Sequence, residues 1–94
     1  TVPQEAAFAK HVYHLYVIRH PKRDQLIAKL AKRGIQALIH YPIPVHLQPA
    51  YKKFAKANLP MTEKISKQIL SLPIYPNLTA KEMAYVAKEL VRLI

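Results

Sequence analysis

The chain has 94 residues, 51% of them hydrophobic, and it contains no cysteine, which excludes a disulfide framework and a thiolate metal site. Its length fits one domain, and no apolar run reaches the roughly 20 residues that a membrane-spanning helix needs. Fifteen Lys and Arg residues against five Asp and Glu residues give a net charge of +10, which attracts anions such as nucleic acid, anionic lipid or phosphorylated small molecules.

We therefore expect a single domain over residues 1–94 with no membrane association. The first ten residues lack the apolar core of a signal peptide, and we expect a cytoplasmic location. The basic charge has two interpretations, a nucleic-acid surface or a solvated exterior. Its lysines are scattered along the chain, and the pattern of aromatic residues in a Lys/Arg-Gly frame that is typical of RNA recognition is absent. The sequence thus favours the solvated exterior.

Residues 1–9 are interpreted as a lead-in segment, and residues 11–19 (HVYHLYVIR) as the first strand. Val, Ile and Tyr dominate this run, and these residue types fit a pleated surface. Both faces of the strand are mostly apolar, as in strands that are covered on two sides. We expect the chain's own helices on one side and a partner domain on the other.

The next predicted element is a helix that begins near Pro21 and ends before Gly34. Proline suits the first helical position, and Asp24 would lie in the first turn, where the helix dipole favours an anion. Gly34 is the only glycine, and it follows Lys32 and Arg33 at a point where helices commonly end in a left-handed conformation. Four apolar residues with helical spacing form the predicted buried stripe: Leu26, Ile27, Leu30 and Ala31.

Residues 35–40 (IQALIH) are predicted to form a second strand directly after this helix. Strand, helix and strand in so short a space favour a split βαβ arrangement or an antiparallel α+β layer. The predicted fold is therefore α+β, with a small, mostly antiparallel sheet of about three strands and helices packed mainly on one face.

Residues 41–49 (YPIPVHLQP) contain three prolines, which fix φ and remove backbone donors. This segment is thus neither a helix interior nor a central strand, and we predict an ordered, extended loop. A short helix is predicted from Pro49 to about Ala57, and another from a Thr62 cap through Leu70.

The last part of the chain is predicted to be extended over residues 71–76 (SLPIYP) and then helical. Thr79 and Glu82 form a T-x-x-E capping box at the start of this helix. One face of the helix is apolar and is predicted to be buried, and the outer face carries the charged residues Lys81, Lys88, Glu89 and Arg92. The apolar positions are Met83, Val86, Ala87, Leu90, Val91 and Ile94.

The proline-rich loop holds the residues best suited to binding. A rigid loop at a strand end presents the polar tips of His40, Tyr41, His46 and Tyr51 in fixed positions. A second interpretation makes the two histidines metal ligands, although zinc sites need three or four ligands. A third interpretation is structural, in which the tyrosines and Leu47 pack and the histidines bond to the backbone.

No catalytic constellation is visible in the sequence. Neither serine stands in a G-x-S-x-G context, and no two of the five carboxylates form a paired acid/base site. A single glycine cannot form a glycine-rich phosphate loop. From the residues alone, the chain is a small basic α+β domain with one rigid loop of aromatic and histidine residues.

The loop and several segments around it resemble one family of enzymes. The matching segments, in chain order, are HVYHLYVIR (11–19), GIQALIHYPIPVHLQPAY (34–51), Leu59-Pro60, Thr62-Glu63 and ILSLPIYPNLT (69–79). Together they make the chain similar to the C-terminal small domain of the DegT/DnrJ/EryC1/StrS family of sugar aminotransferases. The resemblance covers nearly the whole chain.

This resemblance implies a fold, a cofactor and partners. Members of the family are similar to fold-type I aminotransferases, with a large domain that holds pyridoxal phosphate (PLP) and a small C-terminal α/β domain. They work as dimers and usually transfer an amino group from glutamate to a keto sugar on a nucleotide. The implied partners are therefore a sugar nucleotide as substrate, the large PLP domain and the second subunit of a homodimer.

The resemblance also implies roles within the loop. The His-Tyr-Pro motif, here His40, Tyr41 and Pro42, lies near the active-site entrance in the family and helps to frame the sugar nucleotide. We carry over these three residues and His46 as candidate substrate-binding residues. His46 and Gln48 match the remainder of the motif, with a structural role as the alternative. His and Tyr side chains suit substrate contact because they donate hydrogen bonds to hydroxyl and phosphate oxygens.

The chain departs from the family because the large domain is missing. PLP needs a lysine for its Schiff base, a carboxylate for the pyridine nitrogen and a phosphate cradle. None of the eleven lysines stands in the family's cofactor-lysine context. We therefore expect no catalytic and no cofactor-binding residue in this chain, and no activity from the 94 residues alone.

Two alternatives to a sugar aminotransferase stay open at this point. A free-standing basic α+β module that binds nucleic acid would also account for the charge. Within the family, some relatives are dehydratases or have lost catalysis, and the small domain does not distinguish them.

Overall fold

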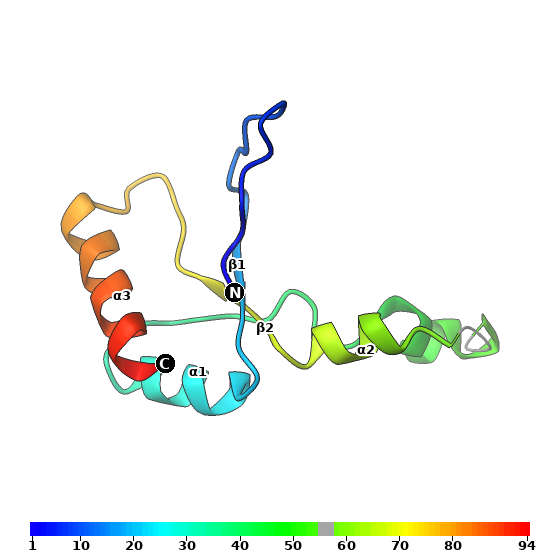
Figure 1. The fold of residues 1–94 in the computed structure, drawn as a ribbon. Helices are drawn as coiled ribbons and strands as arrows, with labels where there is room; N and C mark the ends of the chain where they lie inside the picture. Colours follow the sequence, from blue (N-terminus) through cyan, green and yellow to red (C-terminus); the bar gives the residue numbers. More distant parts are fainter. Residues whose placement is uncertain (55–57) are drawn as a thin grey trace.

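The computed structural model describes residues 1–54 and 58–94 of the chain (Figure 1). β1 and β2 pair in an antiparallel manner, with Tyr16 opposite Leu72 and Arg19 opposite Ile69. The predicted α+β class is confirmed. The elements in chain order are β1 (Tyr16–Arg19), α1 (Arg23–Ala31), the 3-10 helices η1 (Val45–Leu47) and η2 (Pro49–Phe54), α2 (Pro60–Ser66), β2 (Ile69–Leu72) and α3 (Ala80–Leu93).

The described residues form two strands, and the strand predicted at 35–40 is reduced to one bridge. In this bridge Leu38 exchanges both backbone hydrogen bonds with Ser71, at 3.1 and 2.7 Å. The prediction of about three strands is therefore wrong for the part of the chain that the structure describes.

The groups beside the bridge differ at its two ends. In this register the next rungs would use the backbone of Pro73 at one end and of Ile69 at the other. Pro73 has no N–H to donate. The Ile69 carbonyl oxygen already accepts a hydrogen bond from Arg23 Nη1 at 3.0 Å. The proline thus prevents a further rung at one end of the bridge, and at the other end the arginine competes for the Ile69 carbonyl oxygen.

β1 is shorter than the strand predicted at 11–19. Tyr13 has a φ of 48°, in the left-handed region, and this conformation interrupts the extended backbone before β1. The Tyr13 N–H donates to Nδ1 of His11 at 2.7 Å, and its ring stacks on Tyr16 with the centroids 5.8 Å apart. A local aromatic turn therefore replaces the first half of the predicted strand.

α1 is followed by Gly34 in the predicted left-handed conformation, with a φ of 73°. Asp24 lies in the first turn of the helix, also as predicted. The Ile35 N–H donates to the Leu30 carbonyl oxygen at 3.0 Å, which closes the end of the helix. Of the predicted buried stripe, Leu26 and Leu30 are buried and Ile27 is half-buried, whereas Ala31 is exposed and was wrongly predicted.

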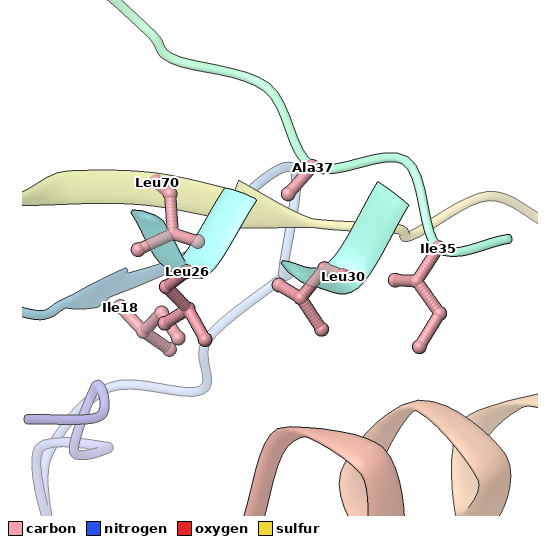
Figure 2. Packing of buried hydrophobic residues seen from close by; sticks show 6 residues of the cluster. All are labelled: Ile18, Leu26, Leu30, Ile35, Ala37 and Leu70. Atoms are coloured by element: carbon pink, nitrogen blue, oxygen red, sulfur yellow. The ribbon is translucent and has the colours of Figure 1, made fainter. Parts of the chain in front are cut away.

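One cluster of buried apolar side chains forms the core, where α1 packs on β1 and β2 (Figure 2). Half-buried residues of α3 pack against the same cluster, so α1 and α3 contribute to one core. The cluster consists of Ile18, Leu26, Leu30, Ile35, Ala37 and Leu70.

α2 is shorter than the helix predicted from Thr62 through Leu70. Leu59 is its N-cap and Pro60 lies in the first turn, so Thr62 does not cap the helix. The helix ends at Ser66, and Leu70 belongs to β2, where its side chain is fully buried. Burial of Leu70 in the core therefore overrides the local helical pattern.

The segment between Tyr41 and α2 contains two 3-10 helices in place of a purely extended loop. η1 interrupts the loop that was predicted to be extended over residues 41–49. The predicted short helix from Pro49 is the 3-10 helix η2, which reaches Phe54. Its predicted end at Ala57 lies outside the described residues.

α3 has the predicted capping box. The Glu82 N–H donates to Thr79 Oγ1 at 3.2 Å, and the Thr79 N–H donates to the Glu82 carboxylate at 2.8 Å. The apolar face that was predicted to be buried is only partly covered, because exposed residues of this face line a groove of about 350 Å³. Val86 and Leu90 are half-buried, and Met83, Ala87, Val91 and Ile94 are exposed. Glu89 was wrongly predicted to lie outside: it is buried, with Arg33 and Arg92 as ionic partners.

The molecule is extended for its length. Its radius of gyration is 15.4 Å, whereas a compact domain of this size has a radius of gyration of about 12 Å. Figure 1 shows two projections from the core: the arm that precedes β1, and the lobe that contains η1, η2 and α2. These two projections account for much of the molecule's elongation.

Candidate functional site

His40 lies two residues beyond the bridge that joins Leu38 to Ser71, at the edge of the sheet. Side chains alternate along an extended segment, so His40 shares a face with Leu38 and is the diagonal neighbour of Ser71. His40 Nδ1 and Ser71 Oγ are 2.9 Å apart, which is a hydrogen-bond distance. The predicted site thus begins at a histidine whose ring is held by β2.

His40 and Ser71 line a cleft of about 440 Å³ between the sheet edge, the segment after β2 and α3. Tyr75 and Tyr85 also line the cleft, together with apolar side chains from the same elements. The Tyr85 hydroxyl donates to the Arg33 carbonyl oxygen at 3.0 Å. Apolar walls with a few polar groups are typical of small-molecule sites.

Glu82 lies at the α3 side of this cleft and is its acidic residue. Hydrogen bonds from the Thr79 hydroxyl and from the Thr79 N–H hold the pKa of the Glu82 carboxyl below its ordinary value. The carboxylate is therefore ionised at neutral pH. The carboxylate interacts with the helix cap, because it accepts both hydrogen bonds from Thr79.

Tyr41 and Pro42 point outward from the same corner of the fold. Tyr41 is 74% exposed, and none of the described residues bonds to its hydroxyl. The rings of His40 and Tyr41 meet edge to face at 86°, with the centroids 5.8 Å apart, and the peptide bond between them is cis. Pro42 is exposed as well. The structure thus brings three of the four predicted residues together at one exposed corner.

His46, the fourth predicted residue, is held elsewhere. Its Nε2 atom lies 3.1 Å from Glu63 Oε1, a contact that ties η1 to α2, and its side chain is only 10% exposed. Gln48 Nε2 donates to the Ile43 carbonyl oxygen at 3.1 Å, within the loop itself. Both side chains therefore have partners inside the lobe, although the partner of His46 is a carboxylate and not the backbone.

The described residues give no support to a metal site or a membrane span. Among residues 1–54 and 58–94, no group of three or more His, Asp or Glu side chains is placed to hold a metal ion. No helix in that part of the chain is long and apolar enough to cross a membrane. The described lining of the cleft beside His40 also includes no lysine, so it does not fit PLP, which needs one for its Schiff base.

Three residues of the cleft were not predicted from the sequence as site residues: Ser71, Tyr75 and Tyr85. A serine in the otherwise apolar strand ILSL is an available indication, because a polar side chain there needs a partner. The identity of that partner depends on the register between Leu38 and Ser71, which no local pattern reveals. The two tyrosines reach the cleft only through the packing of α3 and the segment after β2.

Comparison with known proteins relates the chain to a group of enzymes. The family model described as the DegT/DnrJ/EryC1/StrS aminotransferase family matches residues 1–91. The chain is 41% identical over 90 residues to the pleiotropic regulatory protein of Geobacillus stearothermophilus, covering 94% of the chain and 24% of that protein. It is 46% identical over 79 residues to the dTDP-3-amino-3,4,6-trideoxy-alpha-D-glucose transaminase of Streptomyces venezuelae, covering 82% of the chain and 21% of that enzyme.

A solved structure has the same fold. The crystal structure of S. venezuelae DesV in complex with a ketimine intermediate superposes with a TM-score of 0.90 and 40% sequence identity. The match covers 97% of this chain and 25% of that one. The chain thus spans about a quarter of the length of the relatives it matches. The nucleic-acid alternative gains no support from these matches.

Proposed function

The chain belongs to the DegT/DnrJ/EryC1/StrS aminotransferase family, and on that premise we propose that it is the substrate-framing C-terminal small domain of a PLP-dependent sugar aminotransferase. The longer enzyme would transfer an amino group, with glutamate as donor, to a keto sugar carried on a nucleotide. The S. venezuelae relative is itself a transaminase named for a dTDP-linked amino sugar, which supports this substrate class. The same proposal places the enzyme in the cytoplasm as a homodimer.

One observation carries the proposal: the exposed Tyr41 stands beside a His40 ring that the sheet holds in place. The held His40 ring loses little conformational freedom on binding, so its hydrogen bond to a ligand is not offset by a large ordering cost. None of the described residues bonds to the neighbouring Tyr41 hydroxyl, which can bond to the same ligand. Pro42 restricts the backbone at the same corner. We assign substrate contact to these three residues: His40, Tyr41 and Pro42.

His46 has a different role in this proposal. Its bond to Glu63 supports the shape of the lobe, which in turn supports the corner at Tyr41. Substitution of His46 is therefore expected to act through the stability of the lobe and not through a lost substrate contact.

The chemistry of the corner suits a sugar nucleotide. Imidazole and phenol groups donate hydrogen bonds to hydroxyl and phosphate oxygens, and a tyrosine ring can stack on a sugar or a base. The net charge of +10 adds a long-range attraction for a ligand that carries a diphosphate. Residues of this chain can thus bind and orient the substrate.

The cofactor belongs to the rest of the polypeptide in this proposal. When bound, PLP supplies the electron sink that amino transfer requires. The cleft beside His40 has no lysine among its described lining residues, so we assign no cofactor contact to it. The part of the enzyme outside these 94 residues would hold PLP, and the two projections of this domain would pack against that part and against the second subunit.

The test is kinetic and uses the full-length enzyme. His40→Ala and Tyr41→Ala are each expected to raise the KM for the nucleotide-linked keto sugar or to lower kcat/KM about tenfold, because each change removes a hydrogen bond to the substrate. The KM for the amino donor should change less. His20→Ala serves as a matched control, since the His20 ring lies near the start of α1 and bonds to the Lys22 N–H. Unaltered kinetics in both site variants would contradict the site assignment.

A further inference from the structure

Ser71 is a buried polar residue whose position is fixed from both sides. It is only 4% exposed, in the middle of β2. On one side it pairs with Val17 of β1, and on the other its N–H and carbonyl oxygen both bond to Leu38. It is the one position of β2 with a backbone neighbour in the ladder on each side among the described residues. The backbone that carries the Ser71 side chain is therefore held on both sides.

The direction of the hydrogen bond between Ser71 Oγ and His40 Nδ1 depends on which ring nitrogen carries the hydrogen. A buried hydroxyl needs an acceptor, and the acceptor that the described residues offer to Ser71 Oγ is His40 Nδ1, at 2.9 Å. A hydroxyl that donates to Nδ1 leaves the neutral imidazole with its hydrogen on Nε2. None of residues 1–54 and 58–94 bonds to Nε2, so that N–H remains available to an external acceptor.

We propose that Ser71 is a positioning residue that holds the His40 ring so that its Nε2–H donates to an oxygen of the sugar nucleotide. The proposal rests on the proposed function and names the group that prepares the substrate-contact histidine. The acceptor would be a hydroxyl or phosphate oxygen, because these are the oxygens that such a ligand presents to a neutral N–H donor.

The chain contains a matched control in its other serine. Ser66 is 7% exposed, close to the exposure of Ser71, and its hydroxyl also makes one hydrogen bond, to the Glu63 carbonyl oxygen at 3.0 Å. That bond lies within α2 and does not reach His40. Loss of the Ser66 hydroxyl therefore removes a comparable buried hydrogen bond without affecting the bond between Ser71 and His40.

The experiment combines two readouts on the full-length enzyme labelled with ¹⁵N-histidine. The first is the Nδ1 resonance of His40 at a pH where the ring is neutral, assigned by its loss in His40→Gln. The second is the KM for the nucleotide-linked keto sugar. Ser71→Ala should move the Nδ1 resonance and raise KM about two- to tenfold, the size of one ordinary hydrogen bond. Ser71→Thr keeps the hydroxyl, so its Nδ1 resonance and KM should be close to those of wild type. Ser66→Ala should change neither the resonance nor KM.

A second variant guards against a change in packing. Ser71→Cys keeps nearly the same volume but offers only a weak thiol donor, so it should behave like Ser71→Ala in both readouts. An Nδ1 resonance that stays in place in Ser71→Ala and Ser71→Cys would overturn the positioning role. A resonance that moves while KM stays constant would overturn the link to substrate. A wild-type enzyme that aminates no nucleotide-linked keto sugar would instead refute the proposed function and the proposed acceptor, while the Nδ1 readout would still report on the Ser71–His40 bond.

Discussion

Arg23 shows how one side chain organises several elements of this fold. It is only 9% exposed, and its Nη1 atom donates to the carbonyl oxygens of Ser66 and Ile69 at 3.2 and 3.0 Å. Its Nε atom lies 2.6 Å from Asp24 Oδ1, so the buried charge has an ionic partner. The same guanidinium therefore joins α1 to the end of α2 and to the start of β2.

Gly34 provides a test at the residue scale. Its φ of 73° lies in the left-handed region, and a Cβ atom built there would meet nothing within 4 Å. The cost of a side chain is thus backbone strain without a steric clash, and Gly34→Ala should lower the free energy of unfolding by about 1 kcal/mol. Urea unfolding measures this change.

Gly34→Asn is the companion variant, because asparagine tolerates the left-handed region better than alanine. It should be less destabilised than Gly34→Ala. Equal free energies of unfolding for wild type and Gly34→Ala would show that alanine adopts this backbone conformation without strain.

At the scale of elements, α3 depends on its N-terminal cap. Thr79→Ala removes the hydroxyl that accepts from the Glu82 N–H, and loss of such a cap costs about 1 kcal/mol of stability. The lowered pKa of Glu82 predicts the pH dependence. A carboxyl whose folded pKa is depressed stabilises the fold at neutral pH, and this contribution is lost as the pH falls through the folded pKa.

Glu82→Gln is the variant that isolates this contribution. It should unfold at a lower temperature than wild type at neutral pH, and the difference between the two should shrink in acid. Thermal unfolding followed by circular dichroism between pH 3 and pH 7 gives the comparison, with the pH values chosen to bracket ordinary carboxyl pKa values. A difference that stays constant over this range would contradict the assignment of the ionised carboxylate to the cap.

Local patterns predict α3, α1 and part of the proline-rich loop because each depends on neighbours in the sequence. The T-x-x-E box at Thr79, the left-handed Gly34 and the exposed corner at Tyr41 are all found in the structure. The third strand and the end of α2 were not predicted correctly, because they depend on distant groups. The Arg23 guanidinium donates a hydrogen bond to the Ile69 carbonyl oxygen, and Leu70 lies in β2 because its side chain is buried in the core. The Ser71–His40 bond was missed for the same reason.

At the scale of the whole molecule, the chain leaves much apolar surface uncovered. Met83 and Val91, one ridge of α3, are 51% and 71% exposed and line a groove of about 350 Å³. The radius of gyration of 15.4 Å also exceeds the value of about 12 Å for a compact domain of this size. An apolar surface of this kind promotes association when it is left open.

The isolated 94 residues are therefore expected to self-associate in a concentration-dependent manner. Met83→Lys and Val91→Lys should each reduce this association, as measured by sedimentation velocity. Ala84→Lys is the control, because Ala84 is an exposed residue of α3 outside the groove. A wild-type chain that stays monomeric at high concentration would show that the groove does not drive association.

Contact between the sugar nucleotide and the corner formed by His40 and Tyr41 can be tested by a ligand titration. The full-length enzyme, labelled on histidine and tyrosine side chains, is titrated with the nucleotide-linked sugar and followed by NMR. The His40 and Tyr41 resonances should move in a saturable manner, while those of His20 stay in place. Saturation of the enzyme with both the His40 and Tyr41 resonances unmoved would contradict this contact.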